Sequence, residues 1–337
     1  MLARVLMAVQ ATSRLTARGA SVWRGEHQRS QNWIVPLDDK DCHELIRSAE
    51  ALRGRPLDGI ARAEFPVPRL APKLARISEV LERGSGFVML RGLPAANVPE
   101  HILQIIYWGI GTHLGIGVSQ SAAGDRLGHV FDRGASNDGR YYTRGGPLVF
   151  HMDPVDIVGL LCLRTARSGG ASRIVSSGEV HNLIQAERPD LLEVLYRGFH
   201  NSRRGHGEAT PSARIPVFAK GGHGLECYLL PVTIQQATEE GYLLEFIEQE
   251  ALAFVEEVVS RSGVFLDMDF QVGDIQFLSN RTILHSRTDY VDFPEAERRR
   301  HLWRLWLMTP QWPARPAVMN FHSRVDQAGG GVTPQSG

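Results

Sequence analysis

The first third of the chain carries apolar residues at helical spacing. Between residues 36 and 54 they recur about every 3.6 residues, and Asp38 or Asp39 stands where an N-cap is needed. The apolar run Phe87-Val88-Met89-Leu90, which follows a Gly-Ser-Gly breaker, predicts a buried strand. The spacing predicts helices over residues 36–54, 71–83 and 99–114.

From Leu148 onward the pattern changes to short β-like runs with Gly and Pro between them, which predicts a sandwich or barrel. Ser177 is expected to cap the first of the helices that interrupt these runs. The polar, Gly-rich segment 115–146 precedes the change, and a long irregular stretch of this kind is typical of a binding loop. We predict strands over 148–151, 158–163, 172–175, 215–218, 225–229, 274–278 and 302–307, and helices over 177–185, 189–196 and 243–261.

Composition and charge narrow the class of protein. The chain has 337 residues, with 43% hydrophobic and 22% charged residues, which is ordinary globular composition. Lys plus Arg and Asp plus Glu both number 37, so a nucleic acid or an anionic membrane held by bulk charge is not expected. No apolar run approaches the ~20 residues of a membrane helix. The three cysteines are widely separated, so neither a disulfide framework nor a structural zinc site is indicated.

The two ends are expected to lie outside the folded domain, which we place at residues 31–315. Arg4, Arg14, Arg18 and Arg24 precede the first acidic residue, as in a mitochondrial transit peptide, although a disordered leader on a cytoplasmic protein is favoured over this alternative. Residues 316–337 form the predicted C-terminal tail, whose Gly-rich last part is expected to be disordered. The expected location is therefore cytoplasmic, with a mitochondrial one as the alternative.

One pair of residues carries candidate metal chemistry. His151 and Asp153 lie two apart at the end of an apolar run, and the period of a strand points both side chains to the same face. An isolated His-x-Asp arises by chance in many proteins. Here it is followed by the segment from Gly273 to His285 and then by a group of arginines. Two histidines and one carboxylate form the facial triad of non-haem Fe(II), and an arginine on a later strand suits a dicarboxylate cosubstrate.

In this arrangement the sequence resembles the TauD/TfdA (taurine dioxygenase-like, also called clavaminate-synthase-like) family of Fe(II)/2-oxoglutarate-dependent dioxygenases, over roughly residues 36–310. The resemblance implies an α+β fold with a mainly β core, a double-stranded β-helix (jelly roll) flanked by helices. It implies Fe(II), 2-oxoglutarate and O2 as cofactor and cosubstrates. It also implies an oxidoreductase that oxidises, most simply by hydroxylation, a small anionic substrate while 2-oxoglutarate becomes succinate and CO2.

The family pattern assigns roles to individual residues. His151, Asp153 and His285 are implied as metal ligands and catalytic residues. The carboxylate at Asp153 favours hydroxylation or desaturation-type oxidation over the halogenation of relatives with a small residue there. Arg300 is implied as the residue that binds 2-oxoglutarate, with Arg298 as a weaker competitor.

The stretch Ser168-Gly169-Gly170-Ala171-Ser172 resembles the Gly-Gly-x-Thr segment of the family, so Ser172 would place a hydroxyl on the 2-oxoglutarate carboxylate. Arg304 would contact an acidic group of the substrate, and a structural ion pair is an equal alternative for it. Met152 stands where the family often has threonine, at a position pointing away from the metal. Gln120, Asp132 and Asp156 are further pocket candidates.

Two other functions stay open at this level. A zinc hydrolase also uses two histidines and a carboxylate, but it would need a nearby general base and would leave Arg300 and Ser172 unexplained. A non-catalytic jelly-roll binding protein is disfavoured by the complete triad. We expect a small-molecule substrate as partner, no nucleic acid or membrane, and leave a homo-oligomer open.

Overall fold

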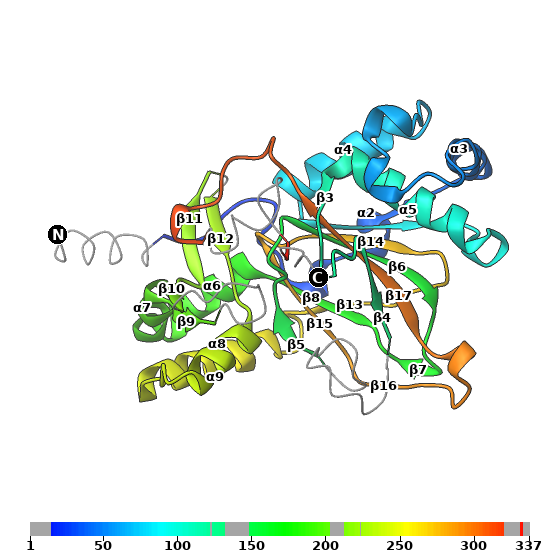
Figure 1. Ribbon diagram of the computed structural model, residues 1–337. Coiled ribbons are helices and arrows are strands. Elements are labelled where there is room, and N and C mark those ends of the chain that lie inside the picture. Colours follow the sequence, from blue (N-terminus) through cyan, green and yellow to red (C-terminus); the bar gives the residue numbers. More distant parts are fainter. Residues whose placement is uncertain are drawn as a thin grey trace.

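The computed structural model of the chain describes residues 15–121, 123–131, 148–202, 212–222, 224–319 and 331–332. Within these residues the core consists of two β-sheets that face each other, with helices on their outer sides (Figure 1). The α+β jelly-roll class that the sequence predicts is therefore confirmed.

The larger sheet has seven strands, six of them in the order β1-β2-β14-β6-β17-β3, with β4 also paired to β17. All its pairings are antiparallel except the parallel pair β1 and β2. The strands are β1 (Ile34–Pro36), β2 (Phe87–Arg91), β3 (Ile116–Gly117), β4 (Leu127–Val130), β6 (Ile157–Arg164), β14 (Ile275–Ser279) and β17 (His301–Met308).

The smaller sheet has four strands in the order β13-β8-β15-β5, all antiparallel. Three two-stranded ribbons lie outside the two sheets. The four strands are β5 (Leu148–His151), β8 (Ser172–Ser176), β13 (Leu266–Met268) and β15 (Ile283–Arg287). The ribbons pair β9 (Phe199–Asn201) with β10 (Ala213–Ile215), β11 (Phe218–Gly221) with β12 (Gly224–Cys227), and β7 (Ser168–Gly169) with β16 (Tyr290–Val291).

Helices cover the outer face of each sheet and give each its own apolar cluster. On the larger sheet α3 (Asp39–Glu50), α4 (Ala71–Arg83) and α5 (Glu100–Leu114) bury their apolar sides against β6, β14 and β17 (Figure 1). On the smaller sheet the covering helices are α6 (Ser177–Glu187), α7 (Pro189–Arg197) and α9 (Phe246–Val259). The remaining helical segments are α2 (Ser30–Trp33), α8 (Pro231–Glu239) and the 3-10 turns at Gly25–His27, Leu57–Gly59, Arg62–Glu64, Ala95–Asn97, Ala296–Arg298 and Ala317–Met319.

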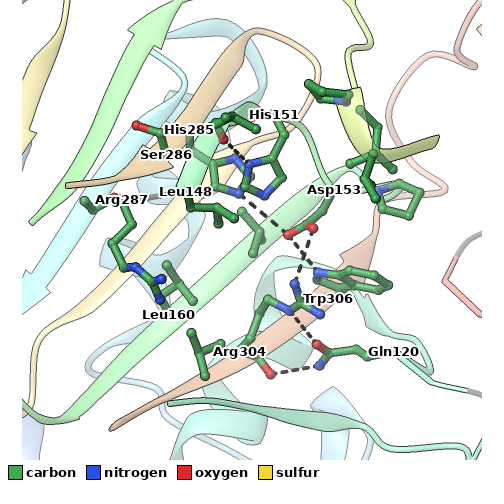
Figure 2. Close-up of a pocket in the computed structure, with 18 of the residues that line it drawn as sticks. Gln120, Leu148, His151, Asp153, Leu160, His285, Ser286, Arg287, Arg304 and Trp306 are labelled. Atoms are coloured by element: carbon green, nitrogen blue, oxygen red, sulfur yellow. Dashed lines mark hydrogen bonds and ion pairs between the residues drawn. The ribbon is translucent and has the colours of Figure 1, made fainter. Parts of the chain in front are cut away.

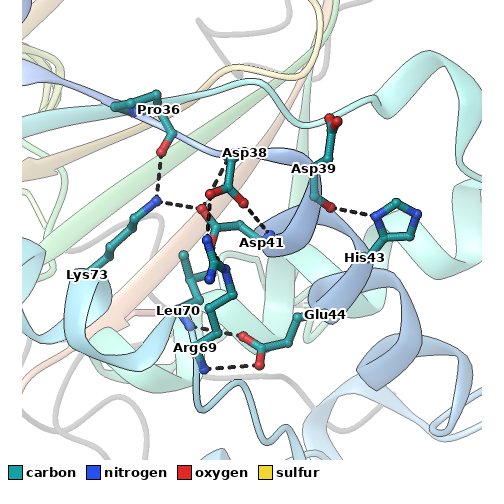
Figure 3. Close-up of polar contacts among 9 residues, drawn as sticks. All are labelled: Pro36, Asp38, Asp39, Asp41, His43, Glu44, Arg69, Leu70 and Lys73. Atoms are coloured by element: carbon teal, nitrogen blue, oxygen red, sulfur yellow. Dashed lines mark hydrogen bonds and ion pairs between the residues drawn. The ribbon is translucent and has the colours of Figure 1, made fainter.

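A network of ion pairs joins α3 to the start of α4 (Figure 3). Asp38 caps α3 by accepting from the backbone N–H of Asp41, and the Asp41 side chain accepts from the backbone N–H of Asp38 in return. The fully buried Asp41 carboxylate also binds Arg69 and Lys73, while Glu44 accepts from the backbone N–H of Arg69. Burying these carboxylates is tolerable because each has cationic or N–H partners. The network fixes the helical layer on the side of the sheet away from the cavity.

Successive side chains of β17 point alternately toward the helical layer and toward the inside of the roll. Trp303, Leu305 and Leu307 join the apolar cluster under the helices. Leu302, Arg304 and Trp306 point the other way and line a cavity between the sheets. This is the period-two rule of a strand, and it makes one strand serve both the core and the site.

Most of the predicted elements are confirmed within a few residues, and some are wrong. Ser176, not Ser177, caps α6, accepting from the backbone N–H of Glu179. The single strand predicted over 215–218 is split into β10 and β11, because Pro216 interrupts the pairing there. Among the described helices and strands, the ones not predicted are α2, α8, β1, β3, β4, β7, β9, β13, β15 and β16.

Segments near both ends contact the domain. Trp23 is buried and donates its indole N–H to the Ser85 carbonyl at 2.9 Å, and Arg24 pairs with Glu179 at 2.8 Å. Near the other end, Val332 is 7% exposed and its backbone N–H donates to the Ser119 carbonyl. The boundaries predicted at residues 30 and 315 stay predictions. None of the helices in the described ranges is long and apolar enough to cross a membrane.

Candidate metal centre and active site

Three side chains of the predicted triad converge at one mouth of the roll. His151 ends β5, Asp153 lies in the turn after it, and His285 sits on β15 directly opposite His151 in the strand register. One donor atom from each residue lies within 4.8 Å of the others (Figure 2). The two imidazole rings have centroids 4.3 Å apart. The sequence pattern thus identified a real spatial cluster, although His151 and His285 are 134 positions apart in the chain.

Local contacts fix the direction of each ligand. The Nδ1 of His151 is 2.9 Å from the carbonyl of Val149, which leaves Nε2 for a metal. Between the two ligands, Met152 is fully buried in the apolar cluster outside the smaller sheet. As predicted, it points away from the triad. Asp153 is held through its backbone N–H, which donates to the side chain of Asn280.

The Asp153 carboxylate has a hydrogen-bond or ion-pair partner for each oxygen (Figure 2). Trp306 donates its indole N–H to Oδ2 at 3.0 Å, and a guanidinium nitrogen of Arg304 is 3.4 Å from Oδ1. Gln120 in turn accepts from Arg304 Nε at 2.8 Å. Burial alone would raise the pKa of the Asp153 carboxyl, but the charge of Arg304 and the Trp306 bond outweigh it and hold that pKa below its usual range. The ligand is therefore anionic at neutral pH.

Both histidines are neutral at physiological pH. Burial, and then the neighbouring His151, lower the pKa of His285 to about 3. Burial also lowers the pKa of His151. A metal ion binds neutral imidazole and ionised carboxylate. The donor set is thus already in the protonation state that a divalent metal needs, and its two nitrogens and one oxygen suit Fe(II) with coordination positions left open.

The triad opens into a cavity of about 720 Å³ between the two sheets. Its walls are mainly apolar. Among the described lining residues Asp153 is the one carboxylate. The lining includes Leu148, Val149, Val158, Leu160, Leu230, Pro231, Val232, Phe270, Leu302 and Val332, with the polar Gln120, Ser172, Thr233, Gln235, Gln236, Arg287, Arg300 and Arg304.

Arg300 lies just before β17 and is 4% exposed. Its Nη2 donates to the Gly170 carbonyl at 3.2 Å, while its buried Nη1 has no hydrogen-bond partner among the described residues. Gly170 has a φ of +76°, and a Cβ there would lie 2.9 Å from Arg300 Nε, so glycine is required for this approach. Burial, with the charge of Arg287, lowers the pKa of Arg300 to about 10, so it stays protonated. A buried, charged donor without a partner fits an acidic ligand in the cavity.

The other predicted ligand-binding residues are placed as follows. Ser172 and Arg304 both line the cavity. The Ser172 hydroxyl donates to the side chain of Gln276 at 3.0 Å. Arg298 is not among the described lining residues, and its largely exposed guanidinium stacks on Phe293. The roles of Arg300, Ser172 and Arg304 in ligand binding stay predictions.

Of the three further pocket candidates, Gln120 lines the cavity and Asp132 lies outside the described residues. Asp156 was assigned wrongly. It is buried away from the cavity, where it binds Arg281, Arg315 and the Thr309 backbone, because it serves as the charged centre of a structural network.

Arg287 and Trp306 are among the cavity residues that the sequence did not identify. Arg287 is two positions beyond His285, so the strand period could have placed it on the same face. The indole bond from Trp306 to Asp153 had no signal in the sequence, since it depends on two strands meeting across the roll.

A jelly roll with a His-Asp-His cluster in a cavity, beside a buried arginine, defines the class of non-haem iron oxygenases. The family model described as taurine catabolism dioxygenase TauD, TfdA family, matches residues 53–306, and the chain belongs to this family. The enzyme class and the cofactors predicted from the sequence, Fe(II), 2-oxoglutarate and O2, are thereby confirmed.

Individual relatives agree with this assignment. FR-33289 synthase of Streptomyces rubellomurinus is 30% identical over 318 residues, covering 90% of this chain and 94% of that protein. An asparagine oxygenase, crystallised with Fe(II), a 3-hydroxyasparagine and succinate, is similar in fold with a TM-score of 0.65 at 17% identity, covering 82% and 94% of the two chains. The non-haem iron oxygenase OrfP, crystallised with Fe and α-ketoglutaric acid, has a TM-score of 0.61 at 15% identity, covering 82% and 93%.

Proposed function

We propose that this dioxygenase hydroxylates a small anionic organic molecule at a site formed by His151, Asp153 and His285, with decarboxylation of 2-oxoglutarate to succinate and CO2. The observation that carries the proposal is the buried Nη1 of Arg300, which has no partner among the described residues and lines the same cavity as the triad. A dicarboxylate that reaches the metal and Arg300 together would satisfy both groups.

The residues of the chain divide the work of binding. The triad would hold Fe(II), which supplies the reactivity toward O2 and 2-oxoglutarate when bound. Arg300 would take the distal carboxylate of 2-oxoglutarate, and the hydroxyl of Ser172 would bind the same group. Arg304 would then pair with the acidic group of the substrate. The apolar walls exclude water and hold the rest of the substrate beside the metal.

The substrate class follows from the charge and size of the cavity. Three arginines and one carboxylate are among its described lining residues, so an anion is favoured over a cation. A volume of about 720 Å³ lies within the range of ordinary ligand pockets and leaves space beyond 2-oxoglutarate. Amino acids are a first group to test, because the solved neighbours were crystallised with hydroxylated asparagine and arginine.

The hydrolase alternative is weakened by the same lining. A zinc hydrolase would use a general base beside the metal. Apart from the implied ligand Asp153, the described part of the cavity has no carboxylate for this role. Nor would hydrolysis use a buried arginine such as Arg300.

The decisive assay follows succinate release and the mass gain of one oxygen atom over a panel of acids and amino acids, with Fe(II) and 2-oxoglutarate supplied. We expect His151→Ala and Asp153→Ala to abolish succinate release, and Arg300→Met to raise the KM for 2-oxoglutarate at least tenfold. The exposed Arg298→Met is the matched control and should behave as wild type. Full turnover in either triad variant would overturn the proposal.

A further inference from the structure

We infer that Arg304 couples metal binding to substrate binding, because the same guanidinium serves the metal-ligand carboxylate of Asp153 and the acidic group of the substrate. The inference rests on the proposed function, which assigns Arg304 to the substrate. It adds an order of events. The anion binds weakly while Arg304 is paired with Asp153, and binds well once a metal ion occupies Asp153.

The geometry places Arg304 between the two sites (Figure 2). Its Nη1 is 3.4 Å from Asp153 Oδ1, and the guanidinium lies 4.4 Å from the Trp306 ring centre. Both Arg304 and Asp153 line the cavity and are less than a tenth exposed. An ion pair in such a place interacts more strongly than one in water, so any change in the charge of Asp153 is felt by Arg304.

Gln120 holds the backbone carbonyl and the Nε of Arg304. The Nη1 of Arg304, which faces Asp153, is the atom that we expect to change partner. The Gln120 Oε1 accepts from Arg304 Nε at 2.8 Å, and its Nε2 donates to the Arg304 carbonyl, also at 2.8 Å. Nε2 donates further to the Arg126 carbonyl at 2.9 Å. Gly128 keeps this packing open, since a Cβ there would lie 2.6 Å from Gln120 Oε1. By comparison the contact to Asp153 is long, and it is the one we expect to be exchanged.

Charge then sets the sign of the coupling. In the metal-free protein Asp153 offsets the charge of Arg304. A divalent ion on Asp153 withdraws this negative charge and adds positive charge nearby, so the same cavity then attracts an anion to Arg304. By linkage, the anion must increase metal affinity by the same factor that the metal increases anion affinity. Known couplings of this kind are about 5–150-fold.

The test uses inorganic sulfate as the anion and Mn²⁺ as a metal that is stable in air, at constant ionic strength and without 2-oxoglutarate. Sulfate binding is followed by tryptophan fluorescence, since Trp306 lies under the guanidinium. Arg300→Met serves as the background, which removes the other predicted anion contact. We expect Mn²⁺ to tighten sulfate binding at least fivefold. We expect the added change Asp153→Asn, which removes the carboxylate charge without a metal, to tighten it to a similar degree in the metal-free protein.

Further variants separate the outcomes. If Arg304→Met abolishes sulfate binding but neither Mn²⁺ nor Asp153→Asn changes it, the coupling is wrong while the substrate contact stands. If sulfate binds equally well to Arg304→Met, or fails to bind with Mn²⁺ present, both the coupling and the role of Arg304 are wrong. Failure of the enzyme assignment would appear separately, as absence of 2-oxoglutarate turnover. Should Asp153→Asn not fold, the titration with and without Mn²⁺ still decides the matter.

Discussion

We expect the indole N–H of Trp306 to strengthen metal binding although Trp306 is not itself a metal ligand. It donates to Asp153 Oδ2 at 3.0 Å inside the roll, where both groups are buried. The change Trp306→Phe removes this donor and keeps an aromatic ring near Arg304. Hydrogen bonds to charged groups contribute about 1.5–3 kcal/mol, which corresponds to about 10–150-fold in an equilibrium constant. Loss of contacts behind a metal ligand typically costs about 10–100-fold in metal affinity. We therefore expect Mn²⁺ to bind Trp306→Phe about 10–100-fold more weakly.

The same strand provides a matched control. Trp303 is fully buried on the opposite face of β17, and its Nε1 has no hydrogen-bond partner among the described residues. Trp303→Phe loses the same atoms and should lower the free energy of unfolding, yet leave Mn²⁺ affinity unchanged. Affinity is measured by calorimetric titration of metal-free protein, and stability by urea unfolding. Equal Mn²⁺ affinity in Trp306→Phe and wild type, within about twofold, would refute the reasoning.

Three further predictions concern stability and the cavity wall. Burial, then His129 and Arg164, lower the pKa of His301 to about 4, so the unfolded chain takes up its proton first as pH falls below about 6.5. Stability should fall from pH 6.5 toward 4, by at most about 1.4 kcal/mol per pH unit from this group, and His301→Gln should remove that part of the slope in urea unfolding across this pH range. Asp156→Asn removes the carboxylate that pairs with the buried Arg315 and leaves Arg281 only its longer pair with Glu226. We expect it to lower the free energy of unfolding in urea by about 3–5 kcal/mol, whereas the exposed Asp190→Asn should leave that free energy unchanged. Val332→Asp places a charge in the cavity wall and should raise the substrate KM with the KM for 2-oxoglutarate unchanged; equal effects on both would contradict this placement.

One-sided burial of a helix, or an unbroken apolar run in a strand, makes an element detectable in the sequence. In α4, for example, the helical period is visible because only one face is buried, and its predicted bounds were confirmed. The strand β15 was missed although it carries His285, because its last three residues, His285, Ser286 and Arg287, are polar and leave too short an apolar run to detect. The helix α8 is short and only weakly amphipathic, and the pattern gave no reason to expect it.

For the site, the sequence determined which residues can bind the metal. The His-x-Asp pair, the distal histidine and the following arginine are residue types that the chemistry requires, and their order along the chain can be recognised without a structure. The sequence also determined the charge that Asp153 brings. Tertiary structure alone decided what each group touches. It placed Trp306, Arg304 and Gln120 behind the carboxylate, and it assigned Asp156 to a structural network instead of the cavity. The physical reason is that pKa values, ion pairs and desolvation depend on neighbours across the two sheets, and those neighbours are distant in the chain.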